Sequence, residues 1–237
     1  MTTLQDVGII VFPSPRARAY LQALMKAEYH PAYAVLVDRV YEPEIKVSDS
    51  IKKSFFDIER TEKETLRKMG VEYASLNAKD INDKSIYDAI KDCPQRMFIY
   101  TGGGIVGNKL LSLKKLIHIH PGIVPAYRGS TCFYYSIIKE GTIGMSAMFL
   151  SEDIDEGSVL GGRIYDVIEG VDIDYILDPY LRSQFLVEVL TSYVDENGFN
   201  PTMQSPNGGE TYYIIHPVLK HIAILKANLR GCRNNGR

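Results

Sequence analysis

The sequence has 237 residues, of which 45% are apolar and 24% charged, as expected for a globular chain that builds a full core. The formal net charge of -2 provides no basic field for nucleic acid, and the three widely spaced cysteines suit a reducing cytoplasm better than a disulfide scaffold. No run of 18 apolar residues and no signal-peptide pattern is present. We therefore expect a cytoplasmic protein without a nucleic-acid or membrane partner.

The chain opens with a predicted strand, helix and strand. Residues 7–12 form an apolar, β-branched run, residues 16–28 have the spacing of an amphipathic helix, and residues 33–37 form a second apolar run. A strand, a helix and a strand in this order are typical of a βαβ unit with parallel strands.

The middle of the chain continues the alternation. Charged and apolar residues follow helical spacing over 48–69, which predicts one helix that ends at Gly70. Further strands are predicted at 71–74, 97–100, 116–117, 144–150 and 159–168, and further helices at 85–91, 108–113 and 131–140. The pattern predicts an α/β fold with a mostly parallel sheet over residues 1–170.

The remainder, residues 171–237, has a different character. A long helix is predicted at 174–194, and loop signals then surround a short strand at 211–215 and a short helix at 217–225. We expect these elements to form a small C-terminal appendage beside the main domain.

Two histidines and an acidic turn are the first candidates for a reaction centre. His118 and His120 lie two positions apart at the end of a predicted strand, so their side chains share one face. Ligands of open α/β sheets bind at this edge. Asp155 is the expected carboxylate partner, since it lies just before Gly157, which permits close backbone approach. Two histidines and an aspartate can also hold a metal ion, but no other residue supports one, and none is predicted.

Other candidates allow two interpretations each. Gly102-Gly103-Gly104 lacks a nucleotide-binding pattern; it suits a wall of bare backbone against a flat ring, or a flexible turn. Arg128 can clamp an anion or fix a loop through a salt bridge. Arg16, just past the first strand, can meet an anionic group of a substrate or begin a solvated helix.

Residues from about 5 to 170 resemble the folate-dependent formyltransferases, which act on glycinamide ribonucleotide, methionyl-tRNA or amino sugars. The family signature is Asn-x-His-Pro, then Leu-Pro-x-x-Arg-Gly, then an Asp-x-Gly turn. This chain has HIHPGIVPAYRG at 118–129 and DEG at 155–157, with the same order and spacing. The tail, GETYYIIHPVLKH, resembles that of the sugar-type members rather than the longer domain of the tRNA enzymes.

The resemblance implies a Rossmann-like catalytic domain over 1–170 that moves a formyl group from 10-formyltetrahydrofolate to a primary amine. His120 would donate to the developing oxyanion and help to move the proton, and Asp155 would fix that histidine. The acceptor would be a small molecule, either an amino sugar nucleotide or an amino-acid-like amine. A homodimer is an open expectation.

The resemblance also implies binding residues. The substrate would be bound by Arg16, Tyr127 and Arg128. The pterin of the folate would meet Thr101, Gly102, Gly103, Gly104, Ile105, Val106, Ser151, Glu152, Asp153 and Ile154.

Two departures from the family bear on function. His118 stands where the family has asparagine, which allows a working variant, a site retuned for another acceptor or for hydrolysis of the donor, or a weak or inactive catalyst that still binds folate. We expect the working variant. The residues after the first strand, 12–15, contain no glycine for a phosphate-binding nest, so glycinamide ribonucleotide is not expected as the acceptor. A 10-formyltetrahydrofolate hydrolase and a two-histidine metal enzyme remain as alternatives.

Overall fold

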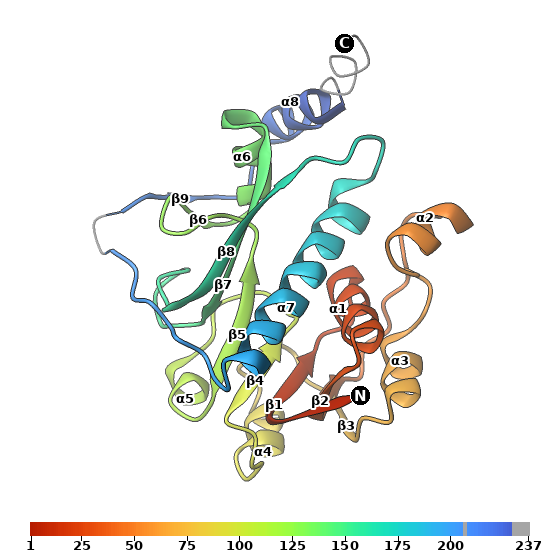
Figure 1. The fold of residues 1–237 in the computed structure, drawn as a ribbon, viewed down its shortest axis with the longest axis vertical. Helices are drawn as coiled ribbons and strands as arrows, with labels where there is room; N and C mark the ends of the chain where they lie inside the picture. Colours follow the sequence, from red (N-terminus) through yellow and green to blue (C-terminus); the bar gives the residue numbers. More distant parts are fainter. Residues whose placement is uncertain (206–207, 229–237) are drawn as a thin grey trace.

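The computed structural model describes residues 1–205 and 208–228. A seven-stranded sheet forms the centre of the molecule (Figure 1). The strand order is β3-β2-β1-β4-β5-β7-β8. The strands are β1 (Thr2–Val11), β2 (Tyr29–Val37), β3 (Tyr73–Leu76), β4 (Met97–Tyr100), β5 (Lys115–His120), β7 (Thr142–Phe149) and β8 (Val159–Asp166). A separate two-stranded sheet joins β6 (Tyr127–Gly129) to β9 (Glu210–Tyr212).

The first five strands of the main sheet run parallel, and only its last two pairings, β5 with β7 and β7 with β8, are antiparallel. The predicted α/β class with a mostly parallel, Rossmann-like sheet is therefore confirmed. Neighbouring residues of β1 alternate between two hydrophobic clusters: Ile9 belongs to one and Ile10 to the other. Because successive strand residues point to opposite faces, this central strand is buried on both.

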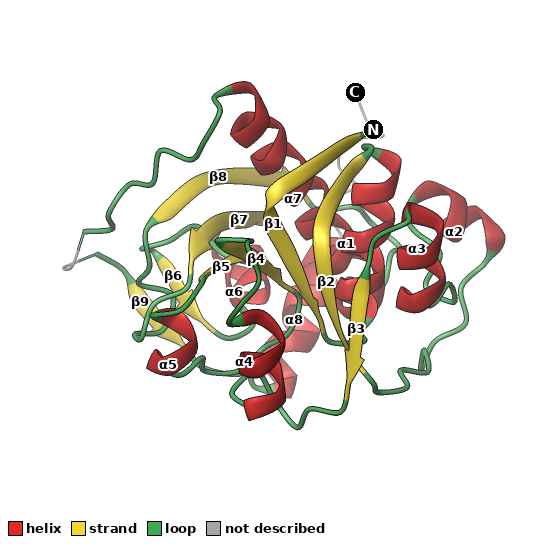
Figure 2. Ribbon diagram, turned by 90° about the horizontal axis from the view of Figure 1, so that it is seen from below, coloured by secondary structure: helices red, strands yellow, loops and turns green. Residues whose placement is uncertain are grey.

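Helices cover both faces of the sheet (Figure 2). Buried residues of α1, α6, α7 and α8 belong to the hydrophobic cluster on one face of the sheet, and buried residues of α4 and α5 belong to the cluster on the other face. The helices are α1 (Pro15–Lys26), α2 (Asp49–Ser54), α3 (Glu62–Met69), α4 (Lys84–Ile90), α5 (Asn108–Leu111), α6 (Cys132–Lys139), α7 (Asp178–Asp195) and α8 (Pro217–Asn228), with a π-helical turn at Ile173–Leu177 before α7.

The single helix predicted over 48–69 is wrong, because α2 ends at Ser54 and α3 begins only at Glu62. Thr61 starts the second helix through a capping box with Glu64, in which each side chain accepts from the other's backbone N–H. The charged and apolar alternation runs on through the linker, so helical spacing alone did not reveal the break. The Thr-x-x-Glu pattern is the local signal that marks it.

Helix α7 belongs physically to the main core. It packs against α1 and also contacts β5, β7 and β8. Its buried Leu181, Phe185 and Leu186 share a hydrophobic cluster with β1 and β5. The predicted division at residue 170 stays a prediction, but α7 lies inside the core rather than beside it. Among the described residues, no helix is long and apolar enough to cross a membrane, and Cys232 lies outside them.

Candidate active site

The candidate site lies beyond the carboxyl ends of the central parallel strands. Strand order reverses between β1 and β4, and open α/β sheets bind their ligands in the crevice at such a point. Two cavities open here, a larger one of about 410 Å³ and a smaller one of about 350 Å³. Arg16 and Gly103 line both, so they form the border between the cavities.

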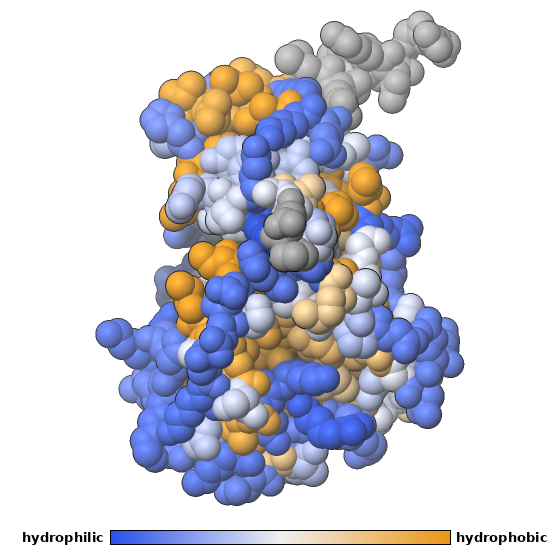
Figure 3. Space-filling model, turned by 90° about the vertical axis from the view of Figure 1, so that its left-hand side faces the viewer, coloured by the Kyte–Doolittle hydropathy of each residue, from blue (hydrophilic) through white to orange (hydrophobic). Residues whose placement is uncertain are grey.

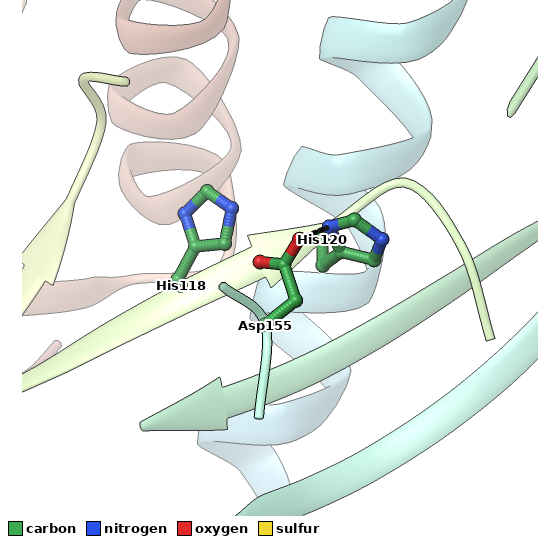
Figure 4. Close-up of side chains that lie close together, drawn as sticks. All are labelled: His118, His120 and Asp155. Atoms are coloured by element: carbon green, nitrogen blue, oxygen red, sulfur yellow. Dashed lines mark ion pairs between the residues drawn. The ribbon is translucent and has the colours of Figure 1, made fainter. Parts of the chain in front are cut away.

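The structure brings His118, His120 and Asp155 together on the larger cavity (Figure 4). The imidazoles leave β5 on one side, with ring centroids 6.4 Å apart. One potential ligand atom from each of the three residues lies within 4.8 Å of the others. Such an arrangement can move a proton, and its geometry would also allow a metal ion. Arg16 and Arg182, which place positive charge beside His118, act against a bound cation.

His120 is almost completely buried and held at both nitrogens. Nε2 lies 2.9 Å from the backbone oxygen of Tyr127, and Nδ1 lies 3.3 Å from Oδ2 of Asp155. A carbonyl oxygen only accepts, so Nε2 carries a proton and the neutral ring keeps its lone pair on Nδ1. Burial lowers the pKa of His120, whereas the Asp155 carboxylate opposes that shift. His120 is therefore built to take up a proton at Nδ1 beside a carboxylate that stabilises the resulting charge.

Asp155 is fixed by its backbone. It adopts a left-handed conformation with φ of 54°, and its Oδ2 accepts from the backbone N–H of Gly129 at 2.8 Å. Gly157 is required two residues later, because a Cβ there would lie 1.7 Å from the backbone oxygen of Phe149. Gln204 donates to the backbone oxygens of Asp155 and Gly157, both at 2.8 Å. The turn thus holds the carboxylate against His120.

His118 is held less tightly. Its Nδ1 is buried and has no hydrogen-bond partner within the described part of the chain. Burial, followed by the charges of Arg16 and Arg182, lowers the pKa of His118 well below the ordinary histidine value. The ring is therefore neutral at physiological pH.

Sequence reasoning missed Arg182 and Asp178, which lie in the first turns of α7. Arg182 lines the larger cavity, pairs with Asp178 at 2.8 Å and donates through Nη1 to the backbone oxygen of Ile119, also at 2.8 Å. Both are less than 10% exposed. The available signal was an opposite charge pair four residues apart at the start of a long helix.

The residues predicted to meet the pterin divide between the two cavities. Residues 103–106 and 151–154 line the larger cavity, whereas Thr101 and Gly102 line the smaller. Residues 211–214, from the tail, complete the wall of the larger cavity and were not predicted. Figure 3 views the side of the molecule that carries β9, where hydrophobic surface lies recessed between hydrophilic side chains.

The three predicted substrate-binding residues lie in different places. Arg16 reaches the border of the cavities and donates from Nη1 to the backbone oxygen of Gly102 at 2.8 Å. Tyr127 donates to Glu140 at 2.6 Å and stacks on Tyr212, and it lines neither cavity. Its contacts give no support to a role in substrate binding.

Arg128 also lines neither cavity, and its contacts are those of a structural residue. It pairs with Glu156 at 2.9 Å, and its Nε and Nη2 donate to Oε1 of Gln204 at 3.2 and 3.0 Å. It thereby ties the 204–205 segment to the turn that carries Asp155.

We expect Arg128→Met to lower the free energy of unfolding by about 1–3 kcal/mol, because a half-buried Gln204 acceptor and a partly exposed carboxylate lose their partner. Urea unfolding measures that loss. The KM for the acceptor amine should not change. A tenfold rise in that KM with unchanged stability would instead assign Arg128 to substrate binding.

The class defined by these features is a doubly wound α/β protein with a histidine–carboxylate centre at its switch point. No protein-family model matches the chain. Among curated relatives, the methionyl-tRNA formyltransferase of a Nitratiruptor species is 24% identical over 134 residues, covering 56% of this chain and 43% of the relative. The methionyl-tRNA formyltransferase of Ehrlichia chaffeensis is 31% identical over 104 residues, which cover 42% of this chain and 34% of the relative. The chain thus spans less than half of these relatives.

Solved structures agree in fold. An N-formyltransferase of Helicobacter canadensis has a TM-score of 0.60 at 11% identity, covering 94% of this chain and 80% of that one. Glycinamide ribonucleotide transformylase 1 of Symbiobacterium toebii has a TM-score of 0.57 at 16% identity, covering 86% and 95%. Sequence and fold therefore both relate this chain to the folate-dependent formyltransferases, and the resemblance predicted from its motifs is confirmed.

Proposed function

We propose that this protein is an N-formyltransferase that moves a one-carbon formyl group from 10-formyltetrahydrofolate to a primary amine of a small substrate. The observation that carries the proposal is the meeting of His118, His120 and Asp155 on a cavity whose walls, 103–106 and 151–154, include the backbone next to two strand ends. Bare backbone donors and acceptors suit the polar edge of a pterin ring.

The two cavities suit the two reactants. The larger cavity contains the histidines and the predicted pterin-binding segments, so we place the folate there. The smaller one meets it at Arg16 and Gly103, and we place the amine there. The Helicobacter canadensis structure is described as a complex with folinic acid and dTDP-3-aminofucose, which supports a folate-type donor for this chain.

The residues account for each step of the transfer. The amine lone pair attacks the formyl carbon, and the carbonyl electron pair moves to oxygen, where the Nε2–H of His118 donates to it. The proton that the amine loses passes to Nδ1 of His120, whose charge Asp155 stabilises at 3.3 Å. Collapse of the adduct breaks the bond between the carbon and the folate nitrogen. His120 returns the proton to that nitrogen, giving the formamide and tetrahydrofolate.

Release of tetrahydrofolate from 10-formyltetrahydrofolate tests the proposal. Candidate acceptors are amino sugar nucleotides and hydroxylated ornithine-like amines, each compared with a reaction without amine. We expect release to require an amine and the product to carry a new formamide. Release that is equally fast without any amine would identify a hydrolase and contradict the proposal.

The smaller cavity also suggests what the acceptor carries. Arg39 and Lys79 line it, and both are exposed without an ion pair among the described residues. Nη2 of Arg39 donates to the backbone oxygen of Lys79 at 3.0 Å, which holds the two segments together. Three aspartates also line this cavity, but Asp174 and Asp178 are paired with Lys220 and Arg182, which leaves Asp80. Two cations without an ion pair in the described part of the chain therefore favour an acceptor with a negative group, such as the diphosphate of a sugar nucleotide or the carboxylate of an amino acid.

We expect the double variant Arg39→Gln/Lys79→Gln to raise the acceptor KM about 10- to 100-fold, which is the loss of one or two charged hydrogen bonds. The value of kcat should change little, because neither residue reaches the histidines. A matched control removes two exposed cations from α3, Lys63→Gln/Lys68→Gln. Equal KM values in both double variants would contradict an anionic acceptor group at this place.

A further inference from the structure

We infer that the buried Nδ1, together with the charges of Arg16 and Arg182, fixes His118 as the neutral tautomer that carries its proton on Nε2, so that this histidine presents a constant N–H donor to the cavity. The role of this donor in catalysis rests on the proposed function, in which His118 donates a hydrogen bond from the position where the family has an asparagine amide. The tautomer itself is a property of the protein without any ligand.

The two ring nitrogens of His118 face different surroundings. Figure 4 shows the two nitrogens on opposite sides of the ring, one on the side where Asp155 lies and the other on the far side. The second is Nδ1, which is buried and has no hydrogen-bond partner among the described residues. The charged or titratable groups around the ring come from four elements: Arg16 and Tyr20 on α1, Arg182 and Asp178 on α7, His120 on β5, and Asp155 in the acidic turn.

Positive charge is held close to the ring by backbone contacts. Nη1 of Arg182 donates to the oxygen of Ile119, the residue next to His118 in β5. Nη1 of Arg16 donates to the oxygen of Gly102 at the end of the neighbouring strand β4. Both guanidinium groups line the cavity that His118 lines. Asp178 is already paired with Arg182, so its negative charge is largely committed to that partner.

These surroundings decide where the single proton of the neutral ring lies. A proton on Nδ1 would be a buried donor without an acceptor among the described residues, which is costly. Nε2 is not among the buried atoms that lack a partner, and His118 lines the cavity, so a proton on Nε2 can meet an acceptor there. Burial and the two arginines also lower the pKa of His118, which opposes the doubly protonated ring. The buried Nδ1 therefore selects Nε2–H, and burial together with the two arginines keeps the ring neutral.

The consequence is a division of labour between two histidines of one strand. His118 donates and does not take up protons, as an amide does. His120 has its Nε2–H committed to Tyr127 and its Nδ1 lone pair facing Asp155, so it is the residue that accepts a proton. Mutual repulsion adds to this division, because a charge on either ring disfavours a charge on the other.

Nitrogen-15 NMR of the histidine rings in the full-length, ligand-free protein tests the tautomer. His118 is assigned by the signals that disappear in His118→Gln. We expect an unprotonated Nδ1 and a protonated Nε2 that stay unchanged between about pH 8 and pH 5.5, below the ordinary histidine pKa. A protonated Nδ1, or a charged ring forming within that range, would overturn the inference.

The role of Arg16 is tested by removing its charge. In Arg16→Met, the midpoint of His118 protonation should rise by about one pH unit or more, and Arg16→Lys should restore most of the original behaviour. Lys26→Met removes a charge from the exposed end of the same helix and should leave the His118 spectrum unchanged. An unaltered spectrum in Arg16→Met would exclude Arg16 from this role. Because no folate or amine is present, a failure of the proposed reaction would not affect these results.

Discussion

Replacing His120 with alanine is expected to lower kcat/KM for formyl transfer by about a thousandfold, within the range that general acid–base groups supply. The ring is the group with a lone pair directed at Asp155, and its Nε2–H bond to Tyr127 prevents it from turning away. His118 is no equivalent base, because burial and then the charges of two arginines lower its pKa well below the ordinary value. The measurement is amine-dependent release of tetrahydrofolate at saturating donor.

The control for this variant is His221→Ala, which removes an exposed histidine on α8. It should retain the full rate. Donor affinity in His120→Ala, measured by fluorescence titration with 5-formyltetrahydrofolate, should stay within a few-fold of the parent value. A parent-like rate in His120→Ala would remove the proposed proton acceptor and with it the mechanism. A lost rate with lost donor binding would show that His120 supports the cavity and not the chemistry.

Replacing Asp178 with alanine is expected to lower the free energy of unfolding by about 3–5 kcal/mol, because a buried guanidinium loses the carboxylate that it pairs with in the described structure. Arg182 is 4% exposed and its Nε lies 2.8 Å from Oδ1 of Asp178. A single positive charge left in the core is much more costly than the pair. Urea unfolding followed by circular dichroism measures the change, and the midpoint should fall markedly.

An exposed ion pair on the same helix provides the comparison. Glu188 pairs with Arg163 at 2.7 Å, with side chains 39% and 55% exposed. Glu188→Ala should cost less than about 1 kcal/mol, since water screens such pairs. Similar losses in Asp178→Ala and Glu188→Ala would mean that burial does not strengthen the dependence of Arg182 on its partner.

Local patterns predicted those parts of the molecule in which neighbouring residues carry the information. The strand at 97–100 has its predicted bounds, because a short apolar run between polar segments has few alternatives. The spacing of His118 and His120 predicts their shared face, since strand geometry fixes it. Asp155 could be selected from a crowded acidic turn only because Gly157 follows it.

Long-range contacts explain what the sequence did not reveal. Arg182 reaches the site because α7 packs across β5, and nothing near residue 182 indicates which strand it will meet. Gln204 stabilises the turn of Asp155 from 49 residues away, and residues 211–214 close the cavity through the pairing of β9 with β6. These contacts depend on how the helices and the sheets pack, so periodicity and motif spacing do not predict them.

The position of Arg16 between the two cavities links their affinities. Its side chain lines both, and its guanidinium is held to the backbone oxygen of Gly102 on their common border. A ligand that draws Arg16 toward one cavity changes the charge that the other presents to its own ligand. Thermodynamic reciprocity then requires the donor to alter the affinity for the acceptor by the same factor as the acceptor alters the affinity for the donor. One arginine can in this way couple the binding of the two reactants.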